Sequence, residues 1–93
     1  MVASKDKRDM ETSRLRLHFY HPREALNLSA NDMGELLDID PYYYYSIENG
    51  RRGHNLGVRL FYEICKCLNL DVIETLEKEV NYQKDRYKDE NDE

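Results

Sequence analysis

The side chains that could do chemistry in this chain are three histidines, two cysteines and eight tyrosines, four of which are consecutive. His18, His21 and His54 lack a nearby nucleophile or the spacing of metal ligands. Cys65 and Cys67 are two residues apart in a helical pattern, so their side chains point in different directions and cannot bridge locally. The same geometry separates adjacent tyrosines. The sequence therefore indicates no enzyme, and we expect no cofactor or metal.

The composition indicates one small globular domain. A chain of 93 residues, 40% apolar and 35% charged, closes a modest core and keeps a well-solvated surface. No stretch approaches the roughly 18 apolar residues of a membrane span, so we expect a cytoplasmic protein with no membrane contact.

The excess of acidic over basic residues lies in the C-terminal part of the chain. The net charge is -5, and residues 71–93 hold nine acids against four bases. Residues 14–59 instead balance six arginines against six acids. The negative sum therefore does not exclude a nucleic-acid partner for the central segment.

The elements that position these side chains are predicted to be five helices. The first runs from roughly Thr12 to Asn27, because Leu15 and Phe19 stand one turn apart. Pro22 removes a backbone donor inside it, which predicts either a kink or two short helices, the second beginning near Pro22.

The second helix is predicted from a capping box. The Ser29 hydroxyl accepts a backbone N–H of the first turn, and the Asp32 carboxylate answers it, so the helix begins at Ala30. Its apolar face ends at Asp38, where a short turn follows.

The third helix carries the tyrosine run. Asp40 is a strong N-cap and Pro41 suits the first helical position. Asn49 and Gly50 tolerate the left-handed conformation that ends a helix. Two helices joined by so short a turn form a helix-turn-helix.

Two further helices complete the domain. One runs from Leu56 to about Leu68, where Asn69 breaks it, and the other begins after Asp71. In the last helix a loose heptad places Ile73, Leu76, Val80 and Tyr87 at a and d positions, with Gln83 as the polar exception. This helix either packs on the domain or pairs two copies of the chain. We expect the run from Lys84 to Glu93 to be frayed. The predicted organisation is a flexible charged leader (1–11), the helical domain (12–80) and an acidic tail (81–93).

Several of these residues together resemble a known family. They are Leu28-Ser29, Met33, Leu37, Ile39, Tyr43-Tyr44 and Ile47-Glu48-Asn49-Gly50-Arg51-Arg52. Over about residues 14–76 the chain resembles the lambda-repressor-like Xre/Cro-type helix-turn-helix DNA-binding family. The resemblance implies an all-α, five-helix domain with a C-terminal helical extension. The helix from Ala30 is then the positioning helix, and the helix 41–48 is the recognition helix, inserted in the major groove.

The resemblance also implies roles for individual residues. The DNA base contacts are Pro41, Tyr42, Tyr45 and Ser46. The DNA phosphate contacts are Ser29, Tyr43, Asn49, Arg51 and Arg52. Arg23 and Glu48 form a partly buried ion pair that fixes the loop after the recognition helix.

The chain departs from the family pattern at the base-contacting positions. None of them is an arginine, asparagine or glutamine, the side chains that make bidentate hydrogen bonds to bases. Ala30 replaces the glutamine frequent at the start of the positioning helix. We expect Tyr44 and Ile47 in the core, and Tyr42, Tyr45 and Tyr43 exposed.

Two functions follow. The first is a repressor-like transcriptional regulator, a homodimer that binds an inverted repeat in double-stranded DNA. The alternative is a helix-turn-helix domain turned to protein binding, as an antirepressor, antitoxin or inhibitor that offers its tyrosine patch to a partner.

Overall fold

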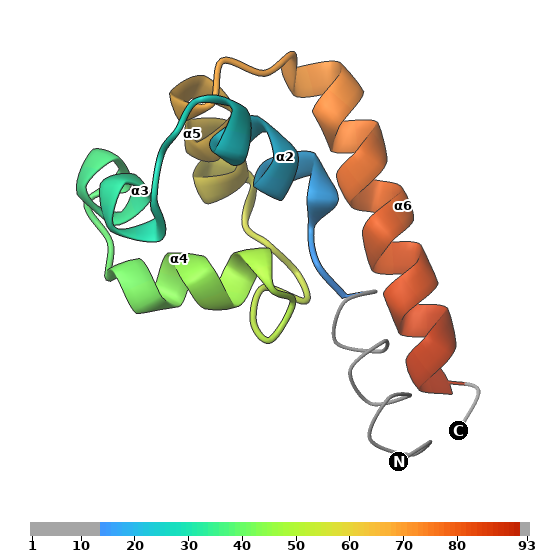
Figure 1. The fold of residues 1–93 in the computed structure, drawn as a ribbon. Helices are drawn as coiled ribbons and strands as arrows, with labels where there is room; N and C mark the ends of the chain where they lie inside the picture. The colour runs from blue at the N-terminus through green and yellow to red at the C-terminus, as the bar shows by residue number, and fades with distance from the viewer. Residues whose placement is uncertain (1–13, 92–93) are drawn as a thin grey trace.

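The computed structural model describes residues 14–91, and it contains five helices and no strand in this range (Figure 1). The helices are α2 (Leu17–Ala25), α3 (Ala30–Leu37), α4 (Pro41–Glu48), α5 (Val58–Cys67) and α6 (Val72–Asn91). The predicted all-α, five-helix architecture is therefore confirmed. The leader predicted for residues 1–11 lies outside the described residues.

Local capping interactions set the start of α3 and of α4. The Asp32 amide donates to Ser29 Oγ at 3.0 Å, and the Ser29 amide donates to Asp32 Oδ2 at 2.8 Å, which is the predicted capping box. Asp40 Oδ1 accepts from the Tyr42 amide at 2.7 Å, and Pro41 occupies the first turn of α4. Both predicted helix starts are confirmed.

A close approach joins α3 to α4. A Cβ atom on Gly34 would lie 2.8 Å from Pro41 Cγ and 2.9 Å from the Ile39 carbonyl oxygen. Only glycine fits such a spacing without movement of the backbone. The two helices and their short turn therefore form one compact unit.

The first described helix differs from its prediction in both start and continuity. α2 begins at Leu17 because the Arg16 amide donates to the Glu48 carbonyl at 2.7 Å, which keeps residues 14–16 out of the helix. The chain also passes through Pro22 without dividing into two helices, so a second start at Pro22 is wrong. Contacts on both sides of the proline hold α2 together: Phe19 is fully buried before it, and Arg23 forms an ion pair after it.

The core lies between α2, α3, α4 and α5. Its buried cluster consists of Phe19, Met33, Leu37, Tyr44, Phe61, Ile64, Cys65 and Leu68. Tyr44 and Ile47 are both fully buried, as predicted. The core thus takes one tyrosine from the run of four and leaves the other three on the surface.

α6 packs on the domain with a different face from the predicted heptad. Thr75 and Glu79 are its buried residues, while Ile73, Leu76 and Val80 are 68%, 40% and 42% exposed. These three heptad positions are therefore exposed, while Tyr87 lies outside the residues whose side chains are described. The helix also continues past Lys84 to Asn91, further than the predicted fraying point. Its start is as predicted, with Asp71 Oδ1 accepting from the Glu74 amide at 2.9 Å.

Candidate nucleic-acid interface

The exposed side of α4 is aromatic. Tyr42, Tyr43 and Tyr45 are 60%, 37% and 48% exposed, and we call these three residues the tyrosine face. The rings of Tyr42 and Tyr45 lie with their centroids 6.5 Å apart at 45°. Pro41 is half-buried at the start of the same helix. The predicted exposure of these tyrosines is confirmed.

Ser46, predicted to contact a base, is instead buried. It is only 1% exposed, and its hydroxyl donates to the Tyr43 carbonyl at 2.8 Å. The loop after α4 folds back over this turn, since the Arg52 amide donates to the Ser46 carbonyl at 3.0 Å. The Ser46 hydroxyl is therefore used in a hydrogen bond within α4, and its side chain is too buried to contact a ligand.

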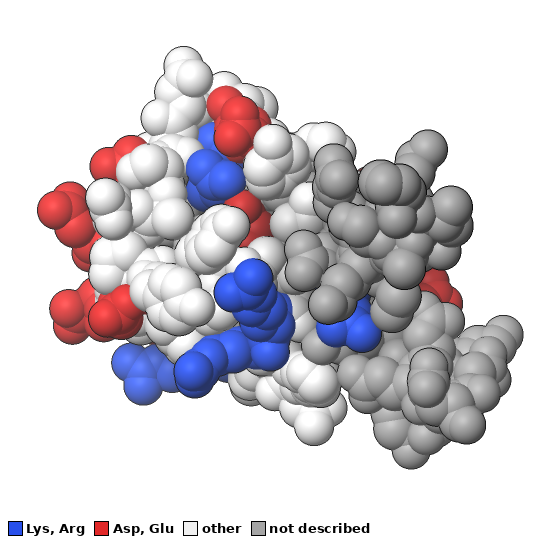
Figure 2. All heavy atoms as spheres, turned by 60° about the horizontal axis from the view of Figure 1, so that its bottom comes forward, with Lys and Arg blue, Asp and Glu red and all other residues white. Residues whose placement is uncertain are grey.

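The loop after α4 holds the arginines expected to contact phosphate. Gly50 has a φ of 85°, and Asn49 Oδ1 accepts from the Arg51 amide at 3.0 Å. Both Arg51 and Arg52 are exposed. Figure 2 shows basic side chains gathered along the lower middle of the face, beside an uncharged surface, with most of the acidic side chains at its left and upper edges. Ser29 is exposed too, and its hydroxyl keeps a proton to donate although its oxygen caps α3.

The ion pair expected between Arg23 and Glu48 is present and bidentate. Arg23 Nε donates to Glu48 Oε2 and Nη2 to Oε1, both at 2.8 Å, while Nη1 donates to the Leu28 carbonyl at 2.6 Å. The Tyr44 hydroxyl also donates to Glu48 Oε2, at 2.9 Å. The hydrogen bond to Glu48 raises the pKa of Arg23, and burial raises the pKa of Tyr44. The pair fixes α2 to the end of α4.

Arg16 is a functional candidate that sequence patterns do not reveal. Its side chain is fully buried, and Nε donates to Glu79 Oε1 at 2.9 Å while Nη2 donates to Oε2 at 2.9 Å. Nη1 donates to the carbonyls of Ile47 at 2.7 Å and Arg52 at 3.2 Å, and Nη2 also donates to the Gly53 carbonyl. No local pattern points to this cluster, because Arg16 and Glu79 are 63 residues apart in sequence.

Glu79 is held as a carboxylate by its neighbours. Burial by itself raises its pKa, but hydrogen bonds from His18 and Arg16, the charge on Arg16 and a hydrogen bond from Gln83 outweigh burial and lower the pKa to about 2. His18 Nε2 lies 2.7 Å from Oε1, and Gln83 Nε2 donates to Oε2 at 2.6 Å. The ionised form of Glu79 therefore stabilises the folded protein.

We expect the protein to lose stability in acid because of Glu79. Its pKa falls from 4.5 to about 2 on folding, so the stabilisation is complete above pH 4.5 and is lost as the pH drops toward 2. The loss is about 3 kcal/mol by linkage. Urea denaturation of the protein and of Glu79→Gln at pH 6, 4 and 2.5 measures it. The stability difference between the two proteins should shrink toward acid, and a constant difference would contradict this assignment.

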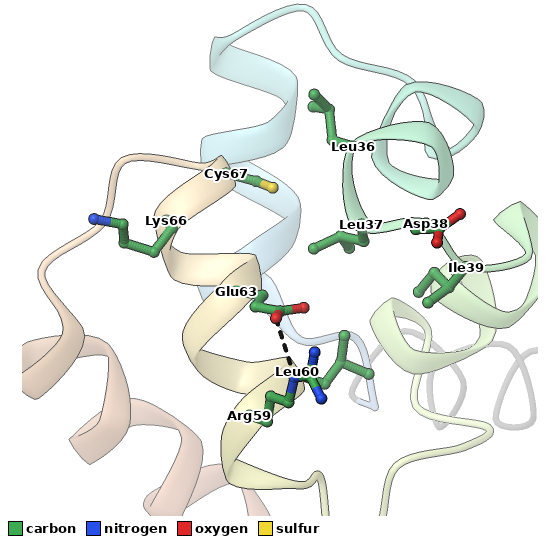
Figure 3. Close-up of a pocket in the computed structure, with 9 residues that line it drawn as sticks. All are labelled: Leu36, Leu37, Asp38, Ile39, Arg59, Leu60, Glu63, Lys66 and Cys67. Carbon is green, nitrogen blue, oxygen red and sulfur yellow. Dashed lines mark hydrogen bonds and ion pairs between the residues drawn. The ribbon is translucent and has the colours of Figure 1, made fainter.

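The described residues also form a groove between the end of α3 and α5 (Figure 3). It has a volume of about 660 Å³ and an apolar lining from Leu36, Leu37, Ile39 and Leu60. The ion pair at its rim, Arg59 Nε to Glu63 Oε2 at 3.3 Å, is exposed to solvent. Cys67 also lines the groove, and burial raises the pKa of its thiol.

The remaining reactive groups are not assembled into a metal or thiol site within residues 14–85. No three histidine, cysteine or acidic side chains there are grouped as metal ligands. Burial raises the pKa of both Cys65 and Cys67, which keeps these thiols protonated at neutral pH. In the part of the chain that the structure describes, no helix has the length and apolar character needed to cross a bilayer.

Comparison with known proteins gave no relative. No protein-family model, no curated protein and no solved structure matches the chain. The candidate interface therefore depends on the residues and contacts described above.

Proposed function

We propose that this chain is a DNA-binding transcriptional regulator that inserts α4 into the major groove of double-stranded DNA as a repressor-like homodimer. The observation that carries the proposal is that the tyrosine face of α4 lies next to the loop with Arg51 and Arg52. The exposed side of α4 leads directly into a loop with two exposed arginines and close backbone turns. An exposed helix that ends at a basic loop suits groove insertion with phosphate contacts at its edge.

The proposed contacts are of two kinds, contacts to bases and contacts to phosphates. Rings on Pro41, Tyr42 and Tyr45 would touch base edges and thymine methyl groups, because none of them offers the bidentate donors of arginine or glutamine. A second group would contact phosphate. It consists of Ser29, Tyr43, Asn49, Arg51 and Arg52. Sequence discrimination therefore comes from shape and apolar contact more than from paired hydrogen bonds.

Selection of binding sites from random duplex DNA tests the function. Anisotropy on the selected duplexes at two salt concentrations then separates phosphate from base contacts. A recovered inverted repeat with half-sites about one helical turn apart supports a homodimeric regulator. If folded protein enriches no sequence, the proposal fails.

Loss of the loop arginines should weaken DNA binding at every sequence. Arg51→Ala with Arg52→Ala removes two exposed cations, and the salt dependence of log K should flatten by about 2, since each phosphate-binding cation accounts for about 1. Arg59→Ala is the control, because it removes one cation whose side chain is 90% exposed on α5. A slope that falls by about 1 in Arg59→Ala, as for each loop arginine, would show that only net charge matters.

A second candidate function is protein binding through the tyrosine face. The observation that favours it is the absence of base-reading side chains on a surface with three exposed tyrosines. Tyrosine provides large contact area with little loss of side-chain entropy and is enriched at protein interfaces. An antirepressor, antitoxin or inhibitor would use this surface without entering DNA.

Substitution of the tyrosine face should change binding and leave stability nearly unchanged. Tyr42→Ala and Tyr45→Ala remove exposed rings, so unfolding free energies should move by less than about 1 kcal/mol. Discrimination between a selected duplex and a scrambled one should fall. Tyr62→Ala is the matched control, being 49% exposed on α5 against 48% for Tyr45. A large stability loss in Tyr45→Ala would contradict the exposed placement of its ring.

A further inference from the structure

The loop that carries Arg51 and Arg52 is organised by a side chain from outside the helix-turn-helix. The carbonyls of Ile47, Arg52 and Gly53 all accept hydrogen bonds from Arg16. The first of these carbonyls lies in the last turn of α4, and the other two lie midway along the segment that joins α4 to α5. One planar guanidinium thus holds the middle of this segment, just after Arg51, against the end of α4.

Arg16 in turn depends on α6. Its side chain is fully buried, and a buried cation is stable only beside a counter-charge. Glu79 provides this charge, with two carboxylate oxygens on Nε and Nη2, and it is itself 3% exposed. Glu79 is oriented by its other partners, His18 and Gln83. α6 is therefore linked to the loop by the hydrogen bonds from Arg16 to Glu79 and to the loop carbonyls.

A second contact holds the same elements together. The ring of Tyr82 on α6 lies 4.5 Å from the guanidinium carbon of Arg16, and its hydroxyl donates to the Arg14 carbonyl at 2.6 Å. A Cβ on Gly50 would lie only 2.7 Å from the Tyr82 hydroxyl oxygen. The first turn of the loop therefore packs closely against both the N-terminal segment and α6.

We infer that Arg16 is the positioning residue of the loop that carries Arg51 and Arg52, and that α6 controls it through Glu79. The consequence for DNA binding rests on the proposed function: phosphate affinity depends on Glu79, a negatively charged residue that is linked to the loop by its hydrogen bonds to Arg16. Docking of α6 and binding of DNA are then coupled, and a partner that displaces α6 would weaken DNA binding.

Glu79→Gln tests this inference, with Glu77→Gln as the matched control. Both variants remove one negative charge from α6, but Glu77 is exposed. The first readout needs no DNA: the rate of trypsin cleavage after Arg51 and Arg52, relative to cleavage after Lys66 in α5, followed by mass spectrometry. Glu79→Gln should raise this ratio on the order of tenfold, because local opening of the loop no longer requires global unfolding. Glu77→Gln should leave it unchanged.

The second readout is DNA affinity. The loss of a negative charge from α6 should raise this affinity, whereas the loss of the loop's fixed position should lower it. Removal of a negative charge by itself favours DNA, so Glu77→Gln should bind equally or more tightly. Glu79→Gln should instead bind several-fold more weakly. A raised cleavage ratio in a protein whose wild type binds no DNA would refute the proposed function and leave the positioning role of Arg16 intact.

Two results would overturn the inference. One is equal acceleration of cleavage at the loop and at Lys66, which shows that Glu79 stabilises only the whole fold. The other is an unchanged ratio in the folded variant. If Glu79→Gln does not fold, Gln83→Ala replaces it, since this change removes one donor to Glu79 and keeps both charges. It should raise the ratio by a smaller factor, and no change would again refute the role.

Discussion

Glu48→Ala is expected to lower the free energy of unfolding by about 3–5 kcal/mol. Glu48 accepts two hydrogen bonds from Arg23 and one from the Tyr44 hydroxyl, and it is 3% exposed. Its removal leaves a partly buried cation and a buried hydroxyl without their acceptor, and the penalty for each is larger than the value of an ordinary hydrogen bond. Urea denaturation followed by circular dichroism measures the change.

Glu63→Ala is the control for this prediction. Its carboxylate also pairs with an arginine, Arg59, but at 3.3 Å in solvent, with the two side chains 42% and 90% exposed. Exposed pairs contribute little, so the loss should stay below about 1 kcal/mol. Similar losses in the two variants would mean that burial does not set the strength of the Glu48 pair.

Gly50→Ala is expected to lower the free energy of unfolding by about 2–4 kcal/mol. The residue has a φ of 85°, which is unfavourable for any side chain with a Cβ. The added Cβ would also overlap the Arg14 carbonyl oxygen and lie 2.7 Å from the Tyr82 hydroxyl oxygen. Thermal unfolding of Gly50→Ala measures this loss. Gly57→Ala shows the effect of replacing glycine by alanine without the positive φ and without the overlap.

Gly57 is a suitable control because a Cβ there meets no atom within 4 Å. It lies before α5, at a φ of -64°, which any residue adopts. Gly57→Ala should therefore change stability by less than about 1 kcal/mol. If Gly50→Ala proves equally mild, the loop is free to move away from Arg14 and Tyr82.

The parts of the fold that could be predicted from the sequence are those that neighbouring residues determine. Ser29 and Asp32 cap α3 from three residues apart, and Asp40 with Pro41 starts α4 in the same local way. The separation of Tyr44 from its neighbours follows from helical period, since only one side of α4 faces the core.

The wrong or missing predictions concern residues whose surroundings are set by contacts from outside their own helix. Ser46 is buried because the loop after α4 folds back over it, and the helical period of α4 alone does not show this. α2 starts at Leu17 since Arg16 is bound to the end of α4. The Arg16 cluster itself needs a partner 63 residues away, and no spacing in the sequence encodes such a contact. The exposed tyrosines of α4 were therefore predictable, whereas the burial of Ser46 and the residues that position the loop after α4 were not.

The Tyr82 to Arg14 and Glu79 to Arg16 contacts also close the chain into a ring, since they join residues 68 and 63 positions apart. The entropic cost of closing such a ring grows only with the logarithm of the number of residues inside it. A few residues added at the exposed turn near Asn55 would lengthen the ring at a cost of about a tenth of a kcal/mol. The number of residues between α4 and α5 is therefore weakly constrained, whereas the two contacts that close the ring are not.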